Sequence, residues 1–353
     1  MSMAVDTAAT TATVSSPGWL RSRTFDVNFI GVIALVAVVT GLVALTQPSL
    51  IVWLLVVDVW LLGYHHVVST FTRLAMDKQS FQQHRFLVIQ LPLIVIAGTL
   101  AAIGVFGFWI LPTVYLYWQW FHYTRQSYGI ERAYRRKADA NAQVDDYVTT
   151  RSLYLLPLFG ILYRSWQAQP RFLGMEVWYV PISDMVLWIV GGLAAVACGW
   201  WLVQSAVAAY RGRLAPAHFL YMLSHQVVFL TGYILIADIT AGWLVLNVWH
   251  NQQYIMFVWW FNNKRFQNGV VPQAKFLSTL CQREHITGYL VFCVGISTVV
   301  YLMLHQTSAS VFSTTAVSAT LTASMIINFH HYVVDGIIWR RRHMKPAATP
   351  AST

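Results

Sequence analysis

Charged side chains are scarce in this 353-residue sequence. Only 10% of the residues are Asp, Glu, Lys or Arg, whereas 57% are hydrophobic and the mean hydropathy is +0.53. A soluble domain usually carries about 25% charged residues. Because so few charges cannot cover a water-facing surface of this size, the composition argues against a soluble globular protein and predicts an integral membrane protein.

Cysteine is also scarce, and the usual cysteine motifs are missing. The chain has three cysteines, Cys198, Cys281 and Cys293, and their spacing matches neither a CxxC pair nor a zinc site. They therefore indicate neither a disulfide framework nor a cysteine-bound metal.

The N-terminal segment lacks the pattern of a signal peptide. Residues 1–24 are rich in Ala, Thr and Ser, and the first long apolar run begins only after Arg21 and Arg23. Further apolar runs follow it, which a cleaved signal sequence would not explain. We predict a disordered tail over 1–24, a single transmembrane domain over 25–343 and a disordered C-terminal tail over 344–353.

Long apolar runs follow one another along almost the whole chain. A membrane-spanning helix needs about 20 apolar residues. The ten predicted spans cover residues 27–46, 50–71, 86–105, 107–127, 150–166, 180–207, 216–237, 241–262, 285–305 and 316–339. The fifth is short and contains Pro157 and Gly160, so a re-entrant or interfacial segment is its alternative. The pattern predicts an all-α polytopic membrane protein with about ten transmembrane helices.

Positive charge gathers at every second boundary between these runs. The formal net charge of +10 would suggest nucleic acid in a soluble protein, but here Lys and Arg lie in short segments beside apolar runs. We therefore expect no nucleic-acid partner. Cytoplasmic loops of membrane proteins carry the excess of Lys and Arg. The alternation predicts both termini in the cytoplasm, in a bacterial inner membrane, with Arg164 and Arg171 as exceptions.

Four of the runs carry histidine together with other polar side chains. Ionisable groups in hydrocarbon are costly and usually mark a site. The clusters are Asp58, His65 and His66 in the second run, Gln119, His122 and Gln126 in the fourth, Asn247, His250, Gln253 and Tyr254 in the eighth, and Asn328, His330, His331 and Asp335 in the tenth. Spacings of three, four or seven residues place most of these side chains on one face of their helix.

The four runs are all even-numbered, so under this topology they cross the membrane in the same direction. At a rise of about 1.5 Å per residue, their histidines lie at comparable depth in the cytoplasmic half of the bilayer. His225, in the seventh run, falls at a similar depth. For any one of these histidines, a satisfied polar group between helices is the alternative. Four clusters at one depth instead favour a shared site.

Imidazole binds Fe, Zn, Cu and Ni, and carboxylates on the same face suit iron or manganese. We predict a metal site with ligands drawn from His65, His66, His122, His250, His330, His331 and Asp335. Ligating histidines are usually oriented by a second hydrogen bond. The residues predicted to orient the ligands are Asp58, Gln119, Gln126, Asn247, Gln253, Tyr254, Asn328 and His225.

This arrangement resembles the histidine-rich integral-membrane non-haem iron enzymes, which include membrane fatty-acid desaturases and hydroxylases and the Brp/Blh-type carotenoid-cleaving dioxygenases. The resemblance is architectural and covers the clusters around His65, His122, His250 and His331. The HxxxH and HxxHH boxes of desaturases are absent, so no catalytic residue is carried over. The resemblance implies one or two iron ions, O₂ as co-substrate, a membrane lipid or isoprenoid substrate, and leaves an electron donor open.

The leading hypothesis is therefore an integral-membrane, metal-dependent oxidoreductase. A haem-binding electron carrier is the first alternative, because histidines on different helices are able to supply axial ligands. A transporter or channel with a His/Asp proton relay is the second. It predicts a continuous polar path and no tightly bound metal.

Overall fold

The computed structural model describes residues 18–138, 144–312 and 316–339. Helices make up nearly all of this part of the chain, which confirms the all-α prediction. The described strands are the two-residue β1 (Arg171–Phe172) and β2 (Met175–Glu176), which pair antiparallel, with Arg171 opposite Glu176. This small hairpin joins two long helices.

The helical elements are α-helices, labelled α, and short segments labelled η. Of these, η1, η3, η4 and η6 are π-helical, and η2, η7 and η8 are 3₁₀-helical. In chain order they are α1 (Arg23–Val27), η1 (Asn28–Val32), α2 (Ile33–Thr46), η2 (Pro48–Leu50), α3 (Ile51–Val57), η3 (Asp58–Tyr64), α4 (His65–Leu74), α5 (Lys78–Gln83), η4 (Phe86–Gln90), α6 (Leu91–Phe106), α7 (Ile110–Lys137), α8 (Asp146–Gln167), α9 (Asp184–Tyr210), α10 (Pro216–Leu230), η6 (Thr231–Leu235), α11 (Ile239–Arg265), η7 (Pro272–Ala274), α12 (Lys275–Leu280), η8 (Arg283–His285), α13 (Ile286–Phe312) and α14 (Ala316–Ile338).

Five helical segments of the described chain are long and apolar enough to cross a membrane. They are Arg23–Thr46, Pro48–Leu74, Phe86–Phe106, Asp184–Tyr210 and Arg283–Leu304. These segments correspond to the first, second, third, sixth and ninth predicted spans. The remaining predicted runs are also helical, in α7, α8, α10, α11 and α14, but carry more polar side chains.

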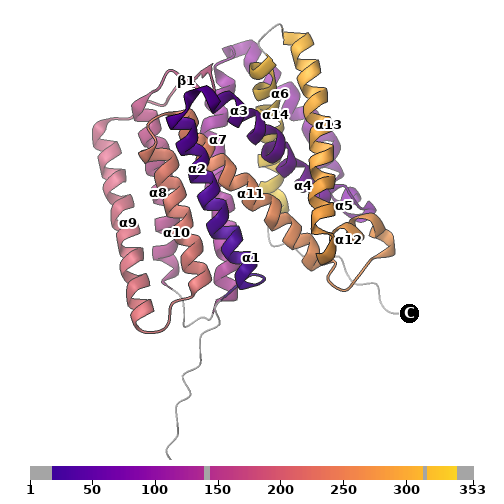
Figure 1. The fold of residues 1–353 in the computed structure, drawn as a ribbon. Coiled ribbons are helices and arrows are strands. Elements are labelled where there is room, and N and C mark those ends of the chain that lie inside the picture. The colour runs from indigo at the N-terminus through magenta and orange to yellow at the C-terminus, as the bar shows by residue number, and fades with distance from the viewer. Residues whose placement is uncertain (1–17, 139–143, 313–315, 340–353) are drawn as a thin grey trace, which may run out of the picture.

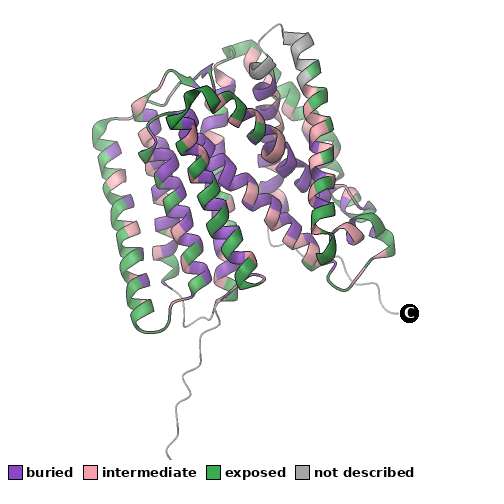
Figure 2. Ribbon diagram, in the orientation of Figure 1, coloured by how far each residue is buried: buried purple, intermediate pink, exposed green. Residues whose placement is uncertain are grey.

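The apolar helices α9 and α13 lie at the periphery of the bundle, whereas the more polar α11 lies inside (Figure 1). α9 stands at one side of the bundle and α13 at the other, and α11 runs obliquely between them. Figure 2 shows that α9 and α13 carry much of the exposed surface, whereas α11 is mostly buried. Exposed side chains such as Leu93, Val196 and Val291, which are 66%, 71% and 65% accessible, form an apolar exterior suited to lipid.

Close helix packing holds α11 at the centre of the bundle. Gly41 of α2 faces α11 so closely that a Cβ atom there would overlap Val245. Gly242 of α11 likewise lies against the carbonyl of Gly232 in η6, where a side chain would not fit. Small residues let helix backbones approach in this way. The contacts fix α11, which carries His250.

The N-terminal boundary is better defined than the sequence predicts. Asp26 is fully buried, and its carboxylate accepts hydrogen bonds from the backbone N–H groups of Leu20, Arg21 and Ser22, each 3.1 Å long. Tyr134 donates to the same carboxylate over 2.6 Å. Residues 18–24, assigned to the disordered tail from composition, are thus anchored to α7. The rest of that tail and the segment 344–353 lie outside the described residues.

The fifth predicted run forms one continuous helix, α8, despite Pro157, so it is not a broken re-entrant loop. Its Arg164 is an exception to the charge alternation for a structural reason. The side chain is 1% exposed and donates to the carbonyl oxygens of Gly232, Ile236 and Ala237, at 2.9, 2.5 and 2.7 Å. Arg164 therefore caps backbone groups at the end of η6.

Candidate metal centre

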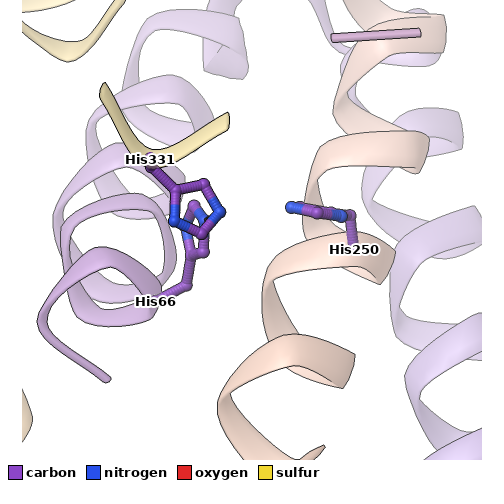
Figure 3. Close-up of side chains that lie close together, drawn as sticks. All are labelled: His66, His250 and His331. Carbon is purple, nitrogen blue, oxygen red and sulfur yellow. Dashed lines mark hydrogen bonds between the residues drawn. The ribbon is translucent and has the colours of Figure 1, made fainter. Parts of the chain in front are cut away.

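Four helices bring four imidazole rings and one carboxylate together. His66 comes from α4, His122 from α7, His250 from α11, and His331 with Asp335 from α14. The ring centroids of His66 and His331 are 4.3 Å apart, and His122 lies 4.9 Å from His250 and 5.0 Å from His331. In Figure 3, His66 and His331 lie side by side and His250 faces them from the helix opposite. All five side chains are buried.

The shortest distances between potential ligand atoms match those around one metal ion, and the others are longer. In the described part of the chain, His66, His250 and His331 form one group with ligand atoms within 4.8 Å of one another, and His122, His331 and Asp335 form another. With bonds of about 2.0–2.1 Å, neighbouring ligands on one ion lie roughly 2.9–3.4 Å apart. Nε2 of His66 is 2.9 Å from Nε2 of His331, which lies 3.3 Å from Oδ2 of Asp335. Nε2 of His122 is 3.9 Å from the same oxygen.

A chain of hydrogen bonds orients these ligands from behind. Nδ1 of His66 donates to the carbonyl of Gly63 over 2.9 Å, which leaves Nε2 with its lone pair facing the centre. Nδ1 of His331 lies 3.2 Å from the hydroxyl of Thr70, and Thr70 lies 3.0 Å from the hydroxyl of Tyr254. Tyr254 donates to Oδ1 of Asp335 over 2.6 Å, so Oδ2 stays available. Such outer hydrogen bonds are typical of metal-binding histidines.

Of the four clustered histidines, His250 is the one with both ring nitrogens unpaired among the described residues. It is 1% exposed, and neither ring nitrogen has a hydrogen-bond partner among the described residues. Leaving a buried polar atom unsatisfied costs about 1–3 kcal/mol. The ring of Tyr123 packs beside it at 4.2 Å, and His122 and His66 lie close by. A cation between these rings would satisfy His250, so the donor set fits a metal ion.

Of the adjacent histidines His65 and His66, both predicted as ligands, the structure brings His66 into the centre. A regular helix would align His65 with Asp58, seven residues earlier. The segment between them, η3, is π-helical, and its wider turn shifts the register. His66 therefore occupies the inner face, while His65 is absent from both ligand groups. π-helical turns inside α-helices frequently occur at functional sites.

His330 and His225 are also not brought into the centre. Nε2 of His330 hydrogen-bonds to the carbonyl of Leu87 over 2.7 Å. His225 uses both ring nitrogens, with Ser127 at 2.7 Å and the carbonyl of Leu153 at 3.1 Å. Both are polar side chains satisfied between helices.

The predicted orienting residues of α3–α4, α7 and α11 form a polar network beside the centre. Asn247 donates to Asp58 and accepts from Tyr123, and Gln119 joins them at 3.3 Å from Asn247. Through Tyr123 the network borders the ring of His250. Asp58, Gln119 and Asn247 thus lie outside the ligand groups and support His250 through packing.

The remaining orienting candidates have separate roles. Gln126 donates to the backbone carbonyl of His250 over 3.1 Å and so ties α7 to α11. Asn328 donates to the carbonyl of Ser324 within α14. Gln253 is buried, and its side-chain atoms make no hydrogen bond to the described residues.

Sequence reasoning missed Thr70 and Tyr332. Thr70 lies one turn after His66 and contacts His331, and the ring of Tyr332 stacks on His122 at 4.3 Å. The i, i+4 spacing of His66 and Thr70 would have marked the hydroxyl, had His66 been chosen as the inward residue.

A cavity of about 590 Å³ borders the centre. His122, Tyr254 and Asp335 form part of its wall. Ligand pockets commonly have volumes of about 300–1,000 Å³. The centre is therefore accessible to a small molecule without opening the helix bundle.

Comparison with known proteins adds no assignment: no family model, curated protein or solved structure matches this chain.

Proposed function

We propose that this protein is an integral-membrane, metal-dependent oxidoreductase that uses O₂ to oxidise a membrane lipid or isoprenoid. The observation that carries the proposal is the clustering of four buried histidines and Asp335 in two groups that share His331, with both ring nitrogens of His250 unpaired among the described residues. Buried polar atoms are rarely left unsatisfied. A cation is the simplest partner for all five side chains.

A single ion fits the arrangement better than two. The same atom, Nε2 of His331, faces both His66 and Asp335, and it has one lone pair to give. The two ligand groups therefore describe one coordination sphere. Imidazole and carboxylate ligands are typical of non-haem iron, although manganese and zinc also accept them. Bound iron would supply the redox chemistry with O₂.

The protein's own side chains supply orientation and protection in this proposal. The carbonyl of Gly63 and the hydroxyl of Thr70 hold the rings of His66 and His331, and Tyr254 donates a hydrogen bond to Oδ1 of Asp335. Their burial excludes bulk water from the centre. The adjoining cavity admits the substrate on the side of His122 and Asp335.

The same proposal places ten helices across the membrane, with α6, α9 and α13 facing lipid and α4, α7, α11 and α14, which carry the centre, inside. α7 ends with Arg135, Arg136 and Lys137, and α11 ends with Lys264 and Arg265. Basic ends on these helices support a cytoplasmic location for that side of the centre and for both termini. The membrane we propose is a bacterial inner membrane.

The ring spacing favours an ion over haem. Centroid distances of 4.3–5.3 Å between His66 and its neighbours His331 and His250 leave no room for a flat macrocycle between them. A proton-relay transporter would keep the histidines but bind no metal.

Elemental analysis of the purified protein, together with its absorption spectrum, tests the proposal. We expect about one iron per chain, no haem absorption band, and O₂ consumption when a lipid substrate is added. A haem spectrum would favour the electron carrier. Metal-free protein that stays folded and cannot be loaded with iron would refute the proposal.

A further inference from the structure

The cavity beside the metal centre follows one face of α7. His122, Arg125, Gly129, Arg132 and Arg136 line it from this helix. Their spacing keeps them on one side of the helix. From His122 to Arg136 the axis rises about 21 Å. The cavity wall therefore changes along its length, from metal ligands to arginines.

Much of the remaining cavity lining is aromatic. The aromatic side chains include Trp118, Phe121, Phe257, Tyr332 and Trp339. Such rings pack well against apolar chains. Among the described lining residues Asp335 is the only carboxylate, and it lies at the metal centre. In the described part of the wall, the arginine end of the cavity has no lining carboxylate.

Arg125 is the arginine best placed to meet a ligand. Arg132, by contrast, is paired with Glu131 and Asp146. Arg125 donates to the hydroxyl of Tyr154 over 2.7 Å and packs at 5.2 Å from the ring of Tyr128. Within the described residues it forms no ion pair. Its charge is therefore available, one helical turn beyond His122.

We propose that this cavity binds an amphiphile with an acidic head group, a carboxylate or phosphate, at Arg125, and an apolar chain against the aromatic wall. The inference rests on the function proposed above, because it names the substrate class for the same centre. Arginine recognises carboxylates and phosphates through charge-assisted hydrogen bonds. The head group would fix the molecule so that its chain passes His122 and Asp335.

Binding of radiolabelled palmitate to the purified protein tests the inference. Hexadecanol has the same chain length with an uncharged head and serves as the comparison ligand. We expect Arg125→Gln to weaken palmitate binding roughly 10- to 100-fold, and to leave hexadecanol binding unchanged. Tyr154→Phe removes the hydrogen bond but keeps the charge, so it should retain palmitate binding.

Arg151→Gln is the matched control, since Arg151 is an exposed arginine that lies against Tyr147 and does not line the cavity. Metal content is measured on every preparation. Equal affinities for palmitate and hexadecanol, unaffected by Arg125→Gln, would overturn the inference even if iron is present. Head-group-dependent binding to a folded protein that cannot be loaded with iron would uphold the site and refute the oxidoreductase.

Competition separates the two sources of such a ligand. Displacement of palmitate by single-chain hexadecyl phosphate, but not by phosphatidylglycerol vesicles, indicates a free amphiphile. Displacement by phosphatidylglycerol indicates a bilayer lipid. Both results support an acidic head group, whereas displacement by neutral phosphatidylcholine to the same extent would contradict it.

Discussion

The substitution Asp335→Asn tests whether the carboxylate serves a cation. The change keeps the shape of the side chain and removes its charge. In the structure Oδ1 accepts from Tyr254, while Oδ2 lies 3.3 Å from His331 and 3.9 Å from His122. Asparagine preserves an acceptor for Tyr254 but offers a neutral amide to the histidines. The effect should therefore fall on metal binding first.

The expected effect of Asp335→Asn on the free energy of unfolding follows from two opposing contributions. Losing a ligand or its orienting partner lowers metal affinity roughly 10- to 100-fold, which at saturating metal removes about 1.4–2.7 kcal/mol of stabilisation. An unpaired carboxylate within a membrane helix costs about 2.5–3.5 kcal/mol. Removing the charge of Asp335 should therefore destabilise the metal-loaded protein but stabilise, or leave unchanged, the metal-free protein.

The assay measures metal affinity by competition with a chelator, and thermal unfolding with and without metal, on one preparation. Tyr254→Phe is the matched variant, because it removes the hydrogen bond and leaves the carboxylate. A fall in unfolding temperature that is equal with and without metal would refute the reasoning. So would unchanged metal affinity in Asp335→Asn.

Two further predictions concern the helices that carry the centre. Asp77 accepts from the backbone N–H and hydroxyl of Ser80 and from Arg265, and although burial opposes them, these interactions hold the pKa of Asp77 below its usual value. Its contribution to stability is fully present above the unfolded pKa of about 3.9 and is lost as the pH falls through the folded pKa. Asp77→Asn should therefore lower the unfolding temperature more at pH 7 than at pH 3, and equal losses at both pH values would contradict this. Gly41→Leu should cost about 1–3 kcal/mol by forcing α2 away from α11, whereas Gly31→Leu, with nothing within 4 Å of its Cβ position, should cost little in a detergent unfolding assay.

Regular helices made part of the centre predictable from sequence. In α7, α11 and α14 the spacing of polar residues correctly indicates which sides face inward, because these helices keep an α-helical register. His122, His250 and the pair His331 and Asp335 come together accordingly.

The choice between His65 and His66 was not predictable in the same way. It depends on the π-helical segment η3, and the sequence carries no clear signal for the extra residue in that turn. The partners of His330 and His225 include backbone carbonyls from distant helices, which have no sequence signature. Adjacent histidines look equivalent in the sequence although their environments differ.

Hydropathy predicts some of the helices more clearly than others. Hydropathy identifies helices that face lipid, such as α2, α6 and α9. The inner helices α7 and α11 contact other helices and tolerate polar side chains, so composition alone identifies them less clearly. Of the helices that build the centre, α4 lies in an apolar segment that hydropathy identifies, whereas α7, α11 and α14 are less visible to it.

The most direct measurement of the central claim compares the two members of each histidine pair. The single variants His66→Ala, His65→Ala, His331→Ala and His330→Ala are purified, and bound iron per chain is measured by elemental analysis. The geometry predicts that His66→Ala and His331→Ala lose the ion, whereas His65→Ala and His330→Ala, which change neighbouring positions on the same helices, retain it. Equal iron content in all four variants, or loss caused by His65→Ala and His330→Ala instead, would contradict the assignment of the centre.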